Sequence, residues 1–285
     1  MQKIILYYKF TPISDPTMTM HWQRELCTRL NLKGRILISE HGINGTLGGD
    51  IENLREYKRE MNRSVIFKDI TYKWSDGGVE DFPKLKVKVK PEIVAFDAPN
   101  EIKVTEKGIV NGGKHLKPHQ VNKLVEERGD EVIFYDGRNA YEAKIGRFKN
   151  TIVPDVTTSR DFKKDIEEGE ISKYKDRPII SYCTGGIRCE ILSAMMLNRG
   201  YKEVYQIDGG IVKYGEKFGD DGLWEGKLFV FDDRMKMGFS DKSKDIAQCE
   251  NCGKNTSNMV NSTNVRRKLH VVCEECSTIV SAVDL

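Results

Sequence analysis

The sequence predicts a multidomain protein that combines α+β and α/β architecture and ends in a cysteine-rich tail. Three observations predict this organisation. Residues 1–95 follow a β-α-β-β-α-β-β order, residues 96–225 continue a strand–helix alternation, and residues 226–285 contain two Cys-x-x-Cys pairs. A chain of 285 residues is long enough for two or three such units. We therefore expect domain boundaries near residues 95 and 225.

Composition and charge narrow the functional classes. The 46 basic and 43 acidic residues leave a net charge of +3, so nucleic-acid contacts must come from local patches. The chain has no leader-like N-terminal segment and no apolar run of about 18 residues, which predicts a cytoplasmic protein without membrane contact. In a reducing compartment, the seven cysteines favour metal binding or catalysis over disulfides.

The first unit has the strand and helix order of a ferredoxin-like α+β sandwich. The predicted strands span 3–10, 35–39, 43–47, 65–74 and 85–89, and the predicted helices span 19–31 and 51–62. The pair Asn44-Gly45 favours a turn or bulge, with a ligand loop as the alternative. In the strand 85–89, four lysines alternate with apolar residues and form one row (Lys84, Lys86, Lys88 and Lys90). The row indicates either a phosphate-binding surface or an edge strand protected from aggregation.

The second unit alternates strands and helices, which predicts a parallel sheet with helices on both faces. The predicted strands are 131–136, one at Ile152, 178–182 and 203–207, and the predicted helices are 116–128, 161–168 and 189–199. Cys183 directly follows one of these strands. Because such sheets bind ligands at the carboxyl ends of their strands, we expect a functional site there.

The segment 183–188, CTGGIR, combines a cysteine, two glycines and an arginine between a strand and a helix. Inward-pointing amides at a helix N-terminus, together with Arg188, favour the Cys183 thiolate, so we interpret Cys183 as a nucleophile. The alternative is a buried, inert cysteine. Cys189 begins the following helix, where it either packs in the core or serves as a resolving thiol.

The tail contains the pairs Cys249/Cys252 and Cys273/Cys276, separated by twenty residues. This spacing predicts a four-thiolate structural zinc site, with a redox dithiol as the alternative. Between the pairs, 266–268 is a basic segment suited to phosphate contacts. No flavin, nicotinamide or haem motif occurs in the sequence.

Residues 105–217 resemble the rhodanese domain, whose Cys-x4-Arg loop carries a persulfide. The resemblance rests on 183–188, on the segment 136–142 (DGRNAYE), on Gly146-x-Phe148 and on 205–211 (YQIDGGI). It implies that Cys183 carries sulfur and that Arg188 is the loop arginine. Asp136, Arg138 and Glu142 belong to a segment that packs beneath the loop, so we expect them to form structural ion pairs.

The chain as a whole resembles the bacterial tRNA uridine(34) hydroxylases. The resemblance rests on the segments 6–10 (LYYKF), 34–46, 182–190 (YCTGGIRCE) and 229–234 (FVFDDR). It implies an oxidoreductase, monooxygenase-like, that hydroxylates the wobble uridine of tRNA to 5-hydroxyuridine. It further implies molecular oxygen as co-substrate, the anticodon loop as partner and Cys183 as catalytic residue. Two alternatives are a rhodanese-type sulfurtransferase and a non-catalytic tRNA-binding scaffold.

Overall fold

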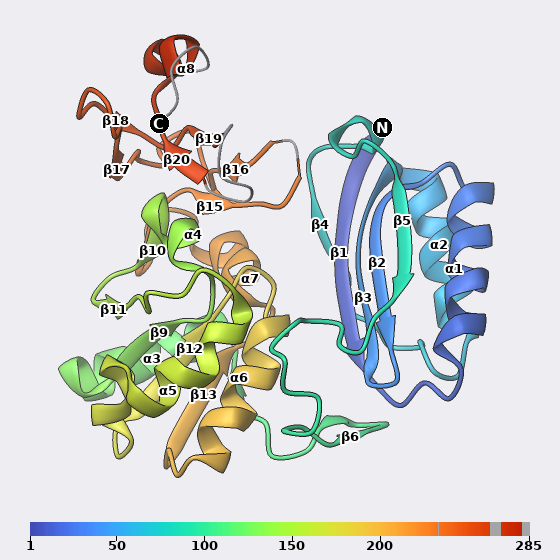
Figure 1. Cartoon of the computed structure of the whole chain (residues 1–285), viewed down its shortest axis with the longest axis horizontal. Coiled ribbons are helices and arrows are strands. Elements are labelled where there is room, and N and C mark those ends of the chain that lie inside the picture. Colours follow the sequence, from blue (N-terminus) through green and yellow to red (C-terminus); the bar gives the residue numbers. More distant parts are fainter. Residues whose placement is uncertain (233, 263–268, 281–285) are drawn as a thin grey trace.

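The computed structural model describes residues 1–232, 234–262 and 269–280, with the side chains of 278–280 excepted. Three parts are visible in Figure 1: an N-terminal sheet covered by two helices, a second sheet with helices on both faces, and a C-terminal tail that lies against both. The predicted combination of α+β and α/β architecture is confirmed. Among the described residues, no helix is long and apolar enough to cross a membrane.

The N-terminal unit is a five-stranded sheet with the strand order β4-β1-β3-β2-β5. Its elements are β1 (Gln2–Phe10), α1 (Pro16–Arg29), β2 (Lys33–Ser39), β3 (Gly42–Asp50), α2 (Ile51–Arg63), β4 (Lys73–Ser75), a 3-10 turn (Val79–Asp81) and β5 (Leu85–Val89). Side chains of β1 alternate between the two faces of the sheet. Ile5 and Tyr7 join the core beneath α1 and α2, whereas Phe10 packs into the core of the second unit.

Two predictions for this unit were wrong. Residues 65–69 form turns and not a strand, because Asp69 takes a left-handed conformation (φ +67°) and Val65 is 80% exposed, so only 73–75 pair with β1. Asn44 and Gly45 lie inside β3 in regular pairing with Tyr8 and Tyr7. The glycine is required there because a Cβ atom would lie 2.3 Å from the Tyr7 ring. The turn between β2 and β3 falls at residues 40–41.

The second unit is a parallel sheet, as predicted, and its strand order is β11-β9-β12-β13-β8, in which β8 is a strand that was not predicted. Its strands are β8 (Lys114–Leu116), β9 (Ile133–Asp136), β11 (Thr151–Ile152), β12 (Pro178–Tyr182) and β13 (Glu203–Ile207). Its helices are α3 (Pro118–Arg128), α4 (Ala140–Lys144), α5 (Phe162–Glu168), α6 (Ile187–Asn198) and α7 (Gly210–Phe218). Apolar residues of α5 and α6 fill the core on one face, and those of α3 and α7 fill the core on the other.

The segment between the two sheets is packed and not a loose linker. Ile93 and Phe96 are 1% exposed and belong to the same core as α5 and α6. The Asn44 side chain also donates a hydrogen bond to the Ile93 carbonyl (3.1 Å). The short elements of the second unit are β6 (Val104–Thr105), β7 (Gly108–Ile109), β10 (Gly146–Phe148), β14 (Trp224–Gly226) and the 3-10 turns at Gly129–Glu131, Ser159–Asp161 and Glu170–Tyr174. The boundaries at residues 95 and 225 stay predictions.

The described residues of the tail form short hairpins and one helix. Its elements are β15 (Leu228–Phe229), β16 (Lys236–Met237), β17 (Ala247–Gln248), β18 (Asn255–Thr256), β19 (Met259–Asn261), β20 (Leu269–Val271) and α8 (Glu274–Val280). Phe229 and Val271 share a small core with Ile145 at the end of α4, and Lys144 forms an ion pair with Glu250 (3.0 Å). The tail therefore packs against the C-terminal end of α4, the helix that contains Glu142.

Candidate active site and metal centre

The loop from Cys183 to Arg188 joins the buried strand β12 to helix α6. Gly186 adopts φ +97°, a conformation that L-residues avoid. The first turn of α7 fixes the loop from outside: the Ile211 amide donates to the Cys183 carbonyl (3.0 Å), and the Val212 amide donates to the Thr184 carbonyl (3.1 Å). With its carbonyls bound in this way, the loop directs amides toward the sulfur.

The Cys183 sulfur has no exposed surface and receives a hydrogen bond from the Gly186 amide (3.2 Å). Burial raises the pKa of the thiol. Hydrogen bonds from the Cys189 thiol and from the amides of Arg188 and Cys189, together with the charge of Arg188, outweigh burial and lower the pKa to about 5. These surroundings favour the thiolate of Cys183 over the thiol at neutral pH.

Cys189, in the first turn of α6, is 1% exposed. Burial and the neighbouring Cys183 raise its pKa well above the ordinary value, so it remains a neutral thiol that donates a hydrogen bond to Cys183. Gly137 leaves room for this sulfur, since a Cβ atom there would lie 3.2 Å from it. The structure brings both cysteines together, which a resolving thiol requires and simple core packing does not.

Arg188 forms a two-pronged ion pair with Glu142: Nη1 lies 2.6 Å from Oε1 and Nη2 lies 2.9 Å from Oε2. Arg188 is 8% exposed and Glu142 is fully buried. Glu142 therefore fixes the Arg188 guanidinium beside the Cys183 sulfur. The sequence predicted only a structural ion pair for Glu142. Because the segment 136–142 was predicted to pack beneath the loop, that position could have identified Arg188 as the partner of Glu142.

The other ion pair of that segment is structural. Arg138 binds Asp136 at 2.6 Å, both side chains have no exposed surface, and the Tyr182 hydroxyl donates to the same carboxylate (2.8 Å). The guanidinium also lies 5.2 Å from the ring centroid of Trp224. Tyr182 and Trp224 are consequently core residues and do not offer a surface for base stacking.

The N-terminal sheet covers the active loop from the other side. A Cβ atom on Gly185 would lie 2.7 Å from Leu6, and one on Gly186 would lie 3.0 Å from the Tyr8 hydroxyl. That hydroxyl donates to Glu190 of α6 (3.1 Å). Both glycines are thus needed for the contact between the two units.

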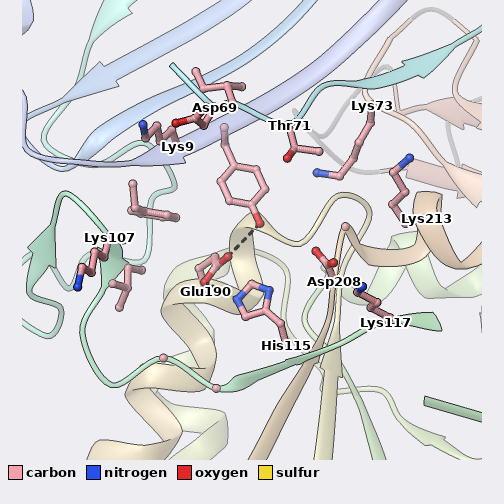
Figure 2. A pocket seen from close by; sticks show the side chains of 18 of the residues that line it. Lys9, Asp69, Thr71, Lys73, Lys107, His115, Lys117, Glu190, Asp208 and Lys213 are labelled. Atoms are coloured by element: carbon pink, nitrogen blue, oxygen red, sulfur yellow. Dashed lines mark hydrogen bonds and ion pairs between the residues drawn. The ribbon is translucent and has the colours of Figure 1, made fainter. Parts of the chain in front are cut away.

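A cavity of about 960 Å³ lies beside this contact. Figure 2 shows Lys9, Thr71 and Lys73 reaching it from the N-terminal unit and His115, Asp208 and Lys213 from the second unit. Glu190 links the two units at this cavity, because its carboxylate accepts hydrogen bonds from the Gln206 side-chain amide (3.1 Å) and from the Tyr8 hydroxyl. Sequence reasoning missed this cavity, which exists only where the two units meet.

Cys249, Cys252, Cys273 and Cys276 form a cluster in the tail, with all four sulfur atoms within 4.8 Å of one another. The Cys252 and Cys273 sulfurs lie 3.7 Å apart. Tetrahedral Zn–S bonds of about 2.3 Å require sulfur–sulfur distances of about 3.8 Å, so the donor set fits a metal ion of this kind. The Cys273 amide and the Asn251 side chain donate to sulfurs of the cluster, both at 3.3 Å.

Family models match three segments: the UPF0176 acylphosphatase like domain at residues 2–93, the rhodanese-like domain at 117–217 and the rhodanase C-terminal domain at 225–283. A tRNA uridine(34) hydroxylase of Corynebacterium urealyticum is 59% identical over 276 residues, covering 96% of this chain and 93% of that protein. The chain belongs to the tRNA uridine(34) hydroxylase family. A family member from Corynebacterium diphtheriae is also 59% identical (96% and 90% covered), and one from an Arthrobacter species is 54% identical (98% and 95% covered).

The sequence predicted two basic segments as candidate phosphate contacts: the lysine row at residues 84–90 and the segment 266–268. All four lysines of the row are exposed, and β5, which carries Lys86 and Lys88 between the flanking Lys84 and Lys90, is an edge strand. The strand stands at the opposite edge of the sheet from β4, about 19 Å away at about 4.8 Å per strand. The row thus lies far from the active loop, and both interpretations of it stay open. The basic segment 266–268 lies outside the described residues.

Proposed function

We propose that this protein hydroxylates C5 of the wobble uridine in the tRNA anticodon loop, giving 5-hydroxyuridine, with molecular oxygen as co-substrate. The reaction is that of a monooxygenase-like oxidoreductase. The observation that carries the proposal is the buried Cys183 sulfur, held as a thiolate by loop amides and a fixed arginine, in a family named for this hydroxylation. The tRNA substrate also supports a cytoplasmic location.

Cys183 is the catalytic nucleophile of this proposal and Arg188 is its electrostatic partner. The thiolate adds to C6 of uracil, which makes C5 nucleophilic toward dioxygen, and an external two-electron donor reduces the second oxygen atom to water. Loss of the C5 proton together with the thiolate then restores the C5=C6 double bond. The low pKa of Cys183 supports both steps, because a stabilised thiolate is present at neutral pH and is also a good leaving group. Glu142 keeps Arg188 in place throughout.

The cavity between the two units suits an RNA loop. Its volume of about 960 Å³ accommodates an extruded base with its sugar and phosphate. A base in a single-stranded loop reaches such a pocket at a cost of about a few kcal/mol, because no duplex must open. Six lysines line the cavity and provide phosphate contacts: Lys9, Lys73, Lys107, Lys117, Lys213 and Lys217.

We further propose that the four tail cysteines hold a structural zinc ion. The tail has few apolar residues in its two small cores, so metal binding would supply much of its folding free energy. No open ligand position is needed for this role, and the zinc takes no part in the reaction. Its effect on catalysis is indirect, through the packing of the tail on α4, the helix that carries Glu142.

The proposal is tested by mass spectrometry of nucleosides from tRNA incubated with wild-type protein or with Cys183→Ser, in air and without oxygen. We expect uridine at the wobble position to gain one oxygen atom only with wild-type protein in air. Sulfur that is released by cyanide from Cys183, without oxygen gain on tRNA, would instead identify a sulfurtransferase. An unchanged yield with Cys183→Ser would assign the loop a scaffold role.

A further inference from the structure

Lys73 is the one buried lysine among the residues that line the cavity. It begins β4 at the edge of the N-terminal sheet, opposite Leu6 of β1, and its side chain is 5% exposed. Within the described parts of the chain it has no hydrogen bond and no ion pair. The other cavity lysines are half-buried or exposed, and Lys213, for example, is paired with Glu216. A buried ammonium without a hydrogen-bond acceptor or an ion pair is costly, so Lys73 is suited to bind a ligand that supplies an acceptor.

The Lys73 ammonium lies against the active loop. It is 4.9 Å from the centroid of the Tyr8 ring and 3.9 Å from the place that a Cβ atom on Gly185 would occupy. Its Cε atom is 3.4 Å from the corresponding position on Gly209, at the start of α7. In Figure 2 the ammonium points into the cavity, above Asp208 and beside Thr71. Lys73 therefore lines the cavity and contacts the active loop at the same time.

The charges around Lys73 suit a proton donor. The groups that face it are Cys183 in the loop, Glu190 of α6, Asp208 after β13 and Lys213 of α7. Burial lowers the pKa of Lys73, the three anions partly offset this, and the result is about 8. A general acid works best when its pKa lies close to the pH of the reaction. A phosphate contact would not require burial or a lowered pKa.

We propose that Lys73, supplied by the N-terminal unit, is the catalytic acid that binds uracil O4 while the Cys183 thiolate adds to C6. In this step the S–C6 bond forms, the C5=C6 electron pair moves through C4 to O4, and the ammonium of Lys73 neutralises the developing enolate by hydrogen bonding or proton transfer. The reverse movement accompanies elimination of the thiolate. The inference rests on the proposed function and gives the N-terminal unit a direct part in the chemistry.

The addition step is measured without oxygen, as exchange of the uridine C5 hydrogen with deuterium from the solvent at saturating tRNA. We expect Lys73→Met to slow this exchange by about 100-fold or more, the usual contribution of a general acid, with tRNA affinity changed by less than about threefold. Lys58→Met is the matched control, because Lys58 also lies over a tyrosine ring (5.6 Å from Tyr72) but outside the cavity. Methionine removes a buried charge, so Lys73→Met is expected to fold with an undiminished thermal midpoint.

A pH profile separates proton donation from simple positioning. Wild-type exchange should fall above a pH of about 8 as Lys73 loses its proton. Lys73→Arg should recover part of the rate and lack this alkaline fall, since arginine stays protonated. Wild-type exchange rates in Lys73→Met, or a loss confined to tRNA affinity, would overturn the inference. The proposed function would still stand in that case if hydroxylation required Cys183 and air.

Discussion

The active loop and the tail contain the same chemical group in two opposite settings. Cys183 is fully buried, with loop amides, a neutral thiol and an arginine around it. The tail cysteines face one another instead, with four sulfurs within 4.8 Å, and Cys252 is exposed. A single thiolate surrounded by donors is a nucleophile, whereas four thiols that converge need a cation to become stable together.

The difference shows that the neighbours of a cysteine decide its chemistry. In the loop, helices α6 and α7 both direct their N-terminal ends to the segment 183–188, and their partial positive charge favours one anion. In the tail, short hairpins supply isolated donors such as the Cys273 amide, too few to stabilise four thiolates. The first three predictions below each change one of these settings and leave the other intact.

The largest effect is expected from Cys183→Ser. Serine keeps the size of the side chain but is not ionised at neutral pH, so hydroxylation of tRNA should fall by about 10³-fold or more. Nucleoside mass spectrometry measures the yield, and metal analysis should show an unchanged metal content. Retention of more than about a tenth of the activity would remove Cys183 from the mechanism.

Replacing one of the four tail cysteines should lower the stability of the protein more than it changes the Cys183 thiolate. Cys276→Ser is expected to lose the metal ion and to lower the thermal midpoint, because structural zinc sites contribute about 10 kcal/mol to the folding of small domains. The ultraviolet absorbance of the Cys183 thiolate should remain. Cys27→Ser, at a buried cysteine of α1 outside the cluster, is the control for metal content. Full metal retention in Cys276→Ser would contradict the four-thiolate site.

Glu142→Gln tests the fixed arginine. It leaves the buried Arg188 charge without its partner, which costs about 3–5 kcal/mol in comparable pairs, and it lets the guanidinium move away from the sulfur. We expect lower stability in chemical denaturation together with a slower reaction. Asp176→Asn is the control, since its pair with Lys202 is exposed and screened by solvent, so its loss should change stability little. Equal effects of the two substitutions on stability and on reaction rate would contradict the role of Glu142 in holding Arg188.

The pH dependence follows from the lowered pKa of Cys183. Its thiolate should be fully formed at neutral pH and should disappear only as the pH falls through about 5. The ultraviolet absorbance of wild-type protein minus that of Cys183→Ser reports this titration. Cys189→Ala removes a hydrogen-bond donor to the sulfur and should raise the pKa of Cys183. An ordinary thiol pKa in wild-type protein would refute the electrostatic account of the loop.

The smallest effect concerns the lysine row on β5. Lys86→Gln and Lys88→Gln together should leave catalysis at saturating tRNA unchanged. If the row contacts phosphates, tRNA affinity falls and the slope of affinity against salt concentration decreases by about 0.9 for each lost contact. If the row only protects an edge strand, affinity stays constant and the variant aggregates more readily.

Sequence reasoning predicted local features well and missed those that depend on distant contacts. The bounds of β5, β12 and β13, the position of Cys183 and the convergence of the tail cysteines all follow from short-range patterns. The pair between Arg188 and Glu142 joins residues 46 positions apart. Lys73 belonged to a predicted strand that is largely turns, and its burial results from a contact between two units. Neither feature has a periodic signal in the sequence.

The most direct test of the central claim supplies dioxygen that carries the heavy oxygen isotope to wild-type protein and tRNA, with Cys183→Ser in parallel. We predict that the wobble 5-hydroxyuridine contains the heavy isotope in the wild-type reaction and that the variant forms none. A hydroxyl group that contains only the ordinary isotope, or labelled product with Cys183→Ser, would contradict an oxygen-dependent reaction at the Cys183 thiolate.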